Sequence, residues 1–293
     1  MKLYLLLIIA LAVPGVAPAE SGSTLLSEQG SRNYIRMSRD QSGPAALEVS
    51  IVRFARTHRT DPVEIDLVSA VHVGDRAYYQ ELNRRFRDYD VVLYELVAPA
   101  EGEVVESDTR VLGFASALQG GMQELLALSH QLDEIDYAAE NFVHADLTPD
   151  QFLESMSNRG ESMFSLFFKA WAVAMSTPAH ERALSDYELF AALLSGDRPR
   201  AFKRMMARQF NDMDRLMSML EGGENGSTLI TVRNQKALEV LQEQLGVGHR
   251  KLAIFYGAGH MPDFAERLQT DFSLVPVSQT WLEAWDLRDP TGE

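Results

Sequence analysis

The sequence predicts an α/β fold with a mixed sheet built from both ends of the chain and an inserted helical subdomain. Strand patterns occur within residues 46–97 and return at 251–277. Residues 63–97 combine strand, helix and strand patterns, a βαβ unit that implies a parallel pair. Residues 149–220 lack strand patterning and have helical spacing.

Composition limits the classes of function. The chain has 293 residues, 46% of them hydrophobic, which suits one large domain or a domain with an inserted subdomain. The net charge of −15 offers no basic face for phosphates, so nucleic acid is excluded as an expected partner. The absence of cysteine excludes disulfides, thiolate nucleophiles and Cys-based zinc sites.

The N-terminus has the pattern of a signal peptide over residues 1–19. Lys2 precedes an apolar run at 3–13, Pro14 and Gly15 interrupt it, and Ala17-Pro18-Ala19 offers a cleavage site. An uncleaved anchor is the alternative, but the run is too short to span a bilayer comfortably. We expect a periplasmic or secreted protein with no transmembrane span after cleavage.

The remaining chain divides into three parts. We expect a leader at 20–46, a single domain at 47–278 with a helical insertion at about 109–222, and a C-terminal tail at 279–293. The domain opens with strands at 46–54 and 63–71, which predict a hairpin. Asp75 stands at an N-cap position before a helix, and a mostly apolar strand follows at 90–97.

The middle and the end of the domain have their own patterns. Helices are predicted at 149–156, 161–175, 187–194 and 199–220, the first of them with Thr148 as N-cap and Pro149 at the first helical position. The Met-rich stripe of the last helix indicates core. The chain then returns to a helix at 228–245, a strand at 251–256, a loop at 257–262, a short helix at 264–268 and a final strand at 272–277.

Three polar residues stand where a predicted core strand ends. His72 and His260 follow apolar strands and small residues, and Glu95 lies within an apolar run. The carboxyl ends of strands line the ligand crevice of open α/β sheets, so these three residues are candidates for one site. Each also has a structural interpretation: a hydrogen-bonded histidine after a strand, or a glutamate facing solvent at a sheet edge.

Three motifs carry a resemblance to a known family. They are Ser69-Ala70-Val71-His72-Val73-Gly74-Asp75 with the following 90–96, Thr231-Val232-Arg233-Asn234, and Phe255-Tyr256-Gly257-Ala258-Gly259-His260. In order and spacing they resemble the TraB/GumN family, which includes Tiki-type metalloproteases and pheromone-shutdown proteins. Two positions depart from its pattern: Ser69 replaces a glycine of the first motif, and Val232 replaces a glutamate of the second.

The resemblance implies a metal-dependent hydrolase, a peptidase in particular, with catalytic residues His72, Glu95, Arg233 and His260. A divalent ion (Mn, Co or Zn) would be held by His72 and His260, with Glu95 as a further ligand or the general base. Arg233 would bind a substrate carboxylate or stabilise an oxyanion; an ordinary surface or helix-pairing arginine is the alternative. The expected partner is a peptide or small-molecule substrate, and self-association into a homo-oligomer is compatible with the sequence.

Two other functions stay open at this point. A more distant resemblance to erythromycin-esterase-like proteins leaves room for metal-free hydrolysis, and Val232 favours a non-catalytic protein that sequesters a peptide or small ligand. His144 and Asp146 lie on one side of an extended segment and are further candidates, with a structural role favoured for Asp146. The other histidines lie in polar or turn contexts and are expected to be solvated: His58, His130, His180 and His249.

Cleavage after Ala19 is directly testable. The exported protein should begin at Glu20, because the A-x-A pattern ends there. Intact-mass analysis of the exported product measures this. A mass that retains residues 1–19 would contradict the cleavage and support the anchor.

Overall fold

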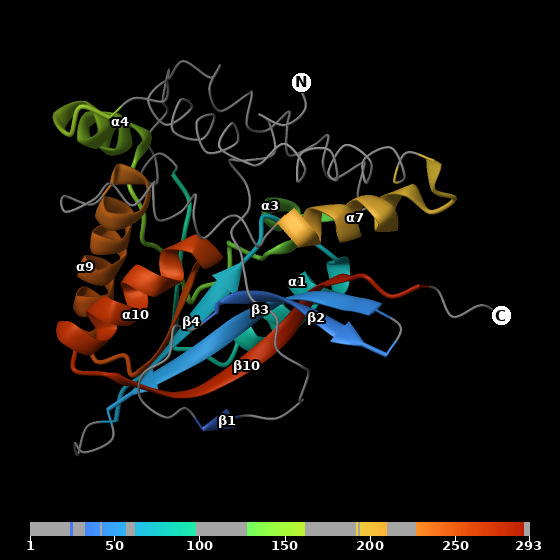
Figure 1. Cartoon of the computed structure of the whole chain (residues 1–293). Coiled ribbons are helices and arrows are strands. Elements are labelled where there is room, and N and C mark those ends of the chain that lie inside the picture. Colours follow the sequence, from blue (N-terminus) through green and yellow to red (C-terminus); the bar gives the residue numbers. More distant parts are fainter. Residues whose placement is uncertain are drawn as a thin grey trace.

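The computed structural model describes residues 24–25, 33–41, 43–56, 62–97, 128–161, 192, 194–209 and 227–289. In this part of the chain eight strands form one sheet. Its order is β1-β10-β3-β4-β9-β6-β8, and β2 pairs with β3 beside this path. The strands are β1 (Thr24–Leu25), β2 (Ile35–Asp40), β3 (Gly43–Ala55), β4 (Glu64–Ala70), β6 (Val91–Tyr94), β8 (Phe142–His144), β9 (Lys251–Gly257) and β10 (Val275–Asp286). Figure 1 shows strands β2, β3 and β10 side by side.

The predicted α/β fold with a mixed sheet from both ends of the chain is confirmed. Strands β4, β9, β6 and β8 run parallel to one another, whereas β3 is antiparallel to its neighbours β2, β4 and β10. The hairpin of β3 and β4 is also as predicted. A second, two-stranded sheet joins β5 (Val73–Gly74) to β7 (Ser129–His130).

The helices lie around this sheet. They are α1 (Arg76–Phe86), α3 (Gln131–Glu134), α4 (Pro149–Asn158), α7 (Arg198–Gln209), the π-helix η3 (Thr228–Val232), α9 (Arg233–Gly246), the 3-10 turn η4 (Ala258–His260) and α10 (Met261–Thr270). Thr148 caps α4 with a capping box and Pro149 begins the helix, as predicted. The predicted helices at 161–175 and 187–194, and the predicted helix beyond Gln209, lie largely or wholly outside the described residues.

The βαβ unit needs one correction. Strands β4 and β6 are parallel and α1 connects them, but they are not neighbours, because β9 from the C-terminal part lies between them. Local periodicity identifies a strand without identifying its partners. The order of the sheet therefore could not follow from the pattern of residues 63–97.

The predicted domain limits are too narrow at both ends. The supposed leader contains β2 and the start of β3, and the supposed tail contains most of β10. A bulge between Glu283 and Trp285 interrupts the alternation of β10, so that Ala284 and Trp285 are both buried. The predicted helical insertion likewise contains β8, which pairs with β6 and belongs to the main sheet.

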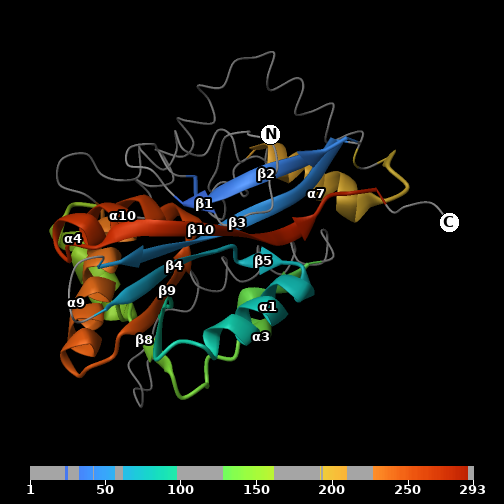
Figure 2. The same ribbon diagram turned by 90° about the horizontal axis from the view of Figure 1, so that it is seen from below.

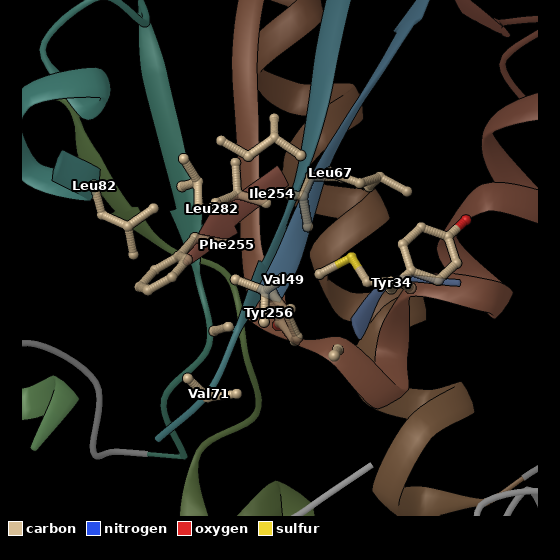
Figure 3. Close-up of a cluster of buried hydrophobic side chains, with 14 of the residues drawn as sticks. Tyr34, Val49, Leu67, Val71, Leu82, Ile254, Phe255, Tyr256 and Leu282 are labelled. Carbon is tan, nitrogen blue, oxygen red and sulfur yellow. The ribbon is translucent and has the colours of Figure 1, made fainter. Parts of the chain in front are cut away.

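Both faces of the central strands are covered. Phe255 of β9 contacts Phe86 of α1, with ring centroids 4.9 Å apart, whereas its neighbour Tyr256 contacts Phe264 of α10 at 5.1 Å. Because successive side chains of a strand point to opposite faces, α1 and α10 lie on different sides of the sheet (Figure 2). Figure 3 shows buried apolar side chains from β3, β4, α1, β9 and β10 converging in this region. The helices thus cover the faces of these central strands, and the candidate residues follow the ends of the strands.

No helix in the described ranges has the length and apolar character needed to cross a membrane. The most apolar predicted helix, at 161–175, lies outside those ranges apart from its first residue.

Asp75 joins three elements. It precedes α1 as predicted, but its side chain does not cap the helix. Its Oδ1 instead accepts a hydrogen bond from Lys203 Nζ of α7 at 2.6 Å, and its Oδ2 accepts one from the backbone N–H of Asp286 in β10. The side chain of Lys203 is only 10% exposed. Asp75 therefore fixes α7 against α1 and the end of β10.

Replacement of Asp75 by Asn should lower the free energy of unfolding by about 2 kcal/mol, because nearly buried Lys203 would lose its counter-charge. Asp88→Asn, in the exposed turn after α1, is the matched control and should stay within about 0.5 kcal/mol. Urea denaturation measures both. Equal stability of the two variants would contradict the role of Asp75.

Candidate functional site

The four parallel strands end at one edge of the sheet, and the candidate residues gather there. Ala70 of β4 is in register with Gly257 of β9, Phe255 of β9 with Tyr94 of β6, and Tyr94 with His144 of β8. The residues just beyond these strand ends therefore share one edge: His72 after β4, Glu95 after β6, Asp146 after β8 and His260 after β9. The sequence prediction placed three of the four at strand ends.

Arg233 is the centre of a buried ion cluster. Its Nε and Nη2 donate to Asp146 Oδ1 and Oδ2 at 2.9 and 2.5 Å, and Nη2 also donates to Glu95 Oε1 at 2.7 Å. The side chains of Asp146, Arg233 and Glu95 are 0%, 11% and 12% exposed. Arg233 is thus not a surface arginine, and its guanidinium is already bound to side chains of this protein. It binds two carboxylates of the chain itself and compensates one of their two charges.

Glu95 is held as an ionised carboxylate. Its Oε2 accepts a hydrogen bond from the backbone N–H of Gly257 at 2.6 Å, while Oε1 accepts from Arg233. Burial alone would raise the pKa of Glu95, but the charge of Arg233 and the other groups around this carboxylate together outweigh burial and hold the pKa well below its usual range. His260 and His72 shift it in the same direction.

His260 is a neutral imidazole with a fixed orientation. Burial lowers its pKa to about 4, with Glu95 opposing and Arg233 reinforcing that shift. Its Nδ1 is 2.6 Å from Asn234 Oδ1, and because an amide oxygen only accepts, Nδ1 carries the hydrogen. The other ring nitrogen, Nε2, lies 3.6 Å from Glu95 Oε1. A neutral ring thus presents a lone pair to a carboxylate oxygen.

His72 belongs to the same edge but is less confined. It is partly buried, its carbonyl accepts from the N–H of Gln131, and its charge when protonated would lower the pKa of Glu95.

His130 lies across from Val73 in the small sheet, and burial lowers its pKa, with His72 adding to that shift. His130, which was expected to be solvated, is partly buried, and its side chain caps α3.

His144 and Asp146 have separate roles. Asp146 is the buried partner of Arg233, in line with the favoured structural role. His144 Nε2 lies 2.6 Å from the carbonyl of Leu96, and its ring packs on Tyr94. His144 thus links the ends of β6 and β8.

The two departures from the family motifs can also be placed. Ser69 is fully buried in β4, and its carbonyl accepts from Tyr78 Oη, so the small residue keeps the strand close to α1. Val232 ends the π-helix η3 and supplies no carboxylate. The two carboxylates that Arg233 binds are those of Glu95 and Asp146.

Sequence reasoning did not include Asn234 or Asp146 in the predicted set of catalytic and metal-binding residues. Asn234 is fully buried and contacts the ring and the carbonyl of His260. Its signal was its position next to Arg233 in the second motif. The signal for Asp146 was the extended segment with His144, although a three-residue strand is too short to show a period.

Part of the site fits a divalent metal. Two ligand bonds of about 2.1 Å at a tetrahedral angle separate their donor atoms by about 3.4 Å. His260 Nε2 and Glu95 Oε1 are 3.6 Å apart, and a neutral imidazole with a carboxylate is a suitable donor pair for Zn, Mn or Co. Among the described residues no three His, Asp or Glu side chains form a metal-binding group. The sequence motifs suggest His72 as the third ligand.

Comparisons of this chain with protein-family models, with curated proteins and with solved structures gave no match.

The lowered pKa of His260 predicts a pH-dependent stability. Between about pH 6.5 and pH 4 the unfolded chain binds a proton at this residue, whereas the folded chain does not. The free energy of unfolding therefore decreases as the pH is lowered through this range. In metal-free protein the His260 contribution between pH 7.5 and pH 5 should be about 2 kcal/mol. His260→Gln should lose this part of the slope.

His249→Gln is the control, since it removes an imidazole before the opposite end of β9. Urea denaturation at the two pH values measures the difference. A wild type and a His260→Gln variant with the same pH dependence would show that His260 is not held neutral by the fold.

Proposed function

We propose that this chain is an exported, metal-dependent hydrolase that uses His72, Glu95 and His260. The observation that carries the proposal is the pair of facing acceptors: the lone pair of His260 Nε2 and the carboxylate oxygen Oε1 of Glu95, 3.6 Å apart. Two acceptors in a buried setting repel each other unless a cation or a hydrogen-bond donor lies between them. A divalent ion satisfies both.

The residues of the chain then have defined tasks. Arg233 and the Gly257 N–H hold Glu95 ionised and in place, so that the carboxylate needs little rearrangement to bind a cation. His260 offers a fixed, neutral nitrogen. His72, partly exposed on the same edge, is the residue with freedom to complete the site. When bound, a divalent metal would supply a Lewis acid and lower the pKa of a bound water.

The pKa of His260 favours this function over metal-free hydrolysis. A general base works best with a pKa near the working pH, and His260 at about 4 is too weak a base for neutral conditions. The same low basicity keeps the nitrogen unprotonated, which is what a metal requires. Metal-free hydrolysis would need another base.

The resemblance to Tiki-type proteins extends the proposal to peptide substrates, and the signal-peptide pattern to a periplasmic or secreted location. The cluster of Glu95, Asp146 and Arg233 has a net charge of −1. Since Arg233 is already bound to two carboxylates, it offers no free charge for the terminal carboxylate of a peptide. Cleavage within a chain or near its N-terminus therefore suits the site better than release of a C-terminal residue.

The test is hydrolysis of a fluorogenic peptide library by purified protein, first treated with a chelator and then supplied with Mn, Co or Zn. Activity should return with metal, and His260→Ala or Glu95→Gln should lower kcat/KM at least about 100-fold because each removes a ligand. His72→Ala should behave likewise if it completes the site. His249→Ala is the matched control and should stay within about twofold.

Each failure points to a different alternative. Chelator-resistant hydrolysis would contradict the metal and support metal-free chemistry. Absence of turnover with every metal and every peptide or ester would contradict the enzyme and support a binding protein on the same scaffold.

A further inference from the structure

Asn234 lies wholly buried between His260 and Asp263. Its Oδ1 contacts His260 Nδ1 at 2.6 Å. Its Nδ2 donates to the carbonyl oxygen of His260 at 3.0 Å and to Asp263 Oδ2 at 2.8 Å. Asn234 thus contacts both the ring and the backbone of the same histidine. The exposed fraction of Asn234 is 0%.

The orientation of this amide is dictated by its partners. A backbone carbonyl and a carboxylate oxygen only accept hydrogen bonds, so the NH2 group of Asn234 must face both. Arg267 Nε donates to the same Asp263 oxygen at 2.8 Å and helps to keep Asp263 in place. The amide oxygen is therefore left for His260, and it can only accept from an N–H at Nδ1.

Glu95 favours the opposite state of the ring. If the hydrogen were on Nε2, His260 could donate to the ionised Glu95 carboxylate, and bonds to charged acceptors are about twice as strong as neutral ones. The contact to Asn234 Oδ1 and the contact to Glu95 thus compete for the single hydrogen of the neutral ring. In the observed geometry Asn234 has the short contact of 2.6 Å, and Glu95 is 3.6 Å from Nε2.

We propose that Asn234, oriented by Asp263, is a positioning residue that holds His260 with its hydrogen on Nδ1 and so keeps Nε2 open toward Glu95. The consequence for metal binding rests on the proposed function; the position of the hydrogen does not. Asn234 sets which nitrogen of His260 is a ligand, and without it the ring turns from a metal ligand into a hydrogen-bond donor to Glu95.

The experiment reads the tautomer directly. In full-length, metal-free protein labelled with 15N-histidine, long-range proton–nitrogen NMR spectra at pH 7 distinguish Nδ1–H from Nε2–H, and His260→Gln identifies the signal. The wild type should show Nδ1–H. Asn234→Ala should shift the ring to Nε2–H, and Asp263→Ala should give a mixture, because one of the two bonds that orient the amide remains.

Asn141→Ala is the matched control. Asn141 Nδ2 also donates to two backbone carbonyls, those of Phe86 and Tyr89, so its loss should destabilise the fold comparably without changing His260. A wild-type ring protonated at Nε2, or an unchanged Nδ1–H ring in Asn234→Ala, would overturn the proposal. The wild-type spectrum alone can do so if the variants fail to fold.

A second arm measures Zn2+ and Mn2+ binding by calorimetry. Asn234→Ala should raise the Kd about 10- to 100-fold, whereas Asn141→Ala should leave it unchanged. An Nδ1–H ring in a wild type that binds neither metal would overturn the proposed metal site while supporting the role of Asn234. Metal affinity unchanged in Asn234→Ala, despite a shifted tautomer, would overturn the link between the two.

Discussion

The ion cluster of Arg233 is the interaction on which the site depends. Asp146, completely buried, ties the end of β8 to the start of α9, and Glu95 adds the end of β6. Removing one partner of such a buried pair costs about 3–5 kcal/mol, because the remaining charge has no water to solvate it. The cluster therefore fixes the distance between strand ends and helix. It also keeps Glu95 ionised, whereas the low basicity of His260 comes chiefly from its burial.

The same cluster explains how rigidity is distributed along the sheet edge. Glu95 and His260 are each held by backbone or amide contacts as well as by charge, whereas His72 is partly exposed. A site with two fixed groups and one adaptable group can admit a ligand without repacking the core. The net charge of −1 left by Glu95, Asp146 and Arg233 favours a cation over an anion at this edge.

Much of this could be predicted from the sequence, for physical reasons. Alternation and apolar runs identified β3, β4, β6 and β9, and the strand-end context grouped His72, Glu95 and His260. Strand order could not be predicted, because backbone pairing leaves no local trace in the sequence. Asp146 was not assigned to the site because the three residues of β8 are too few for a period. The prediction ended β10 at residue 277, where a register shift between Pro276 and Ser278 interrupts the strand pairing.

The insertion of β9 between β4 and β6 has a consequence for how the protein matures. Strands β4 and β6 leave the ribosome long before β9 is synthesised. In the sheet they do not pair with each other, and each pairs with β9. Pairings between distant segments form slowly, and until they form the two earlier strands have open edges. The parallel part of the sheet therefore cannot assemble until residues 251–257 have been synthesised.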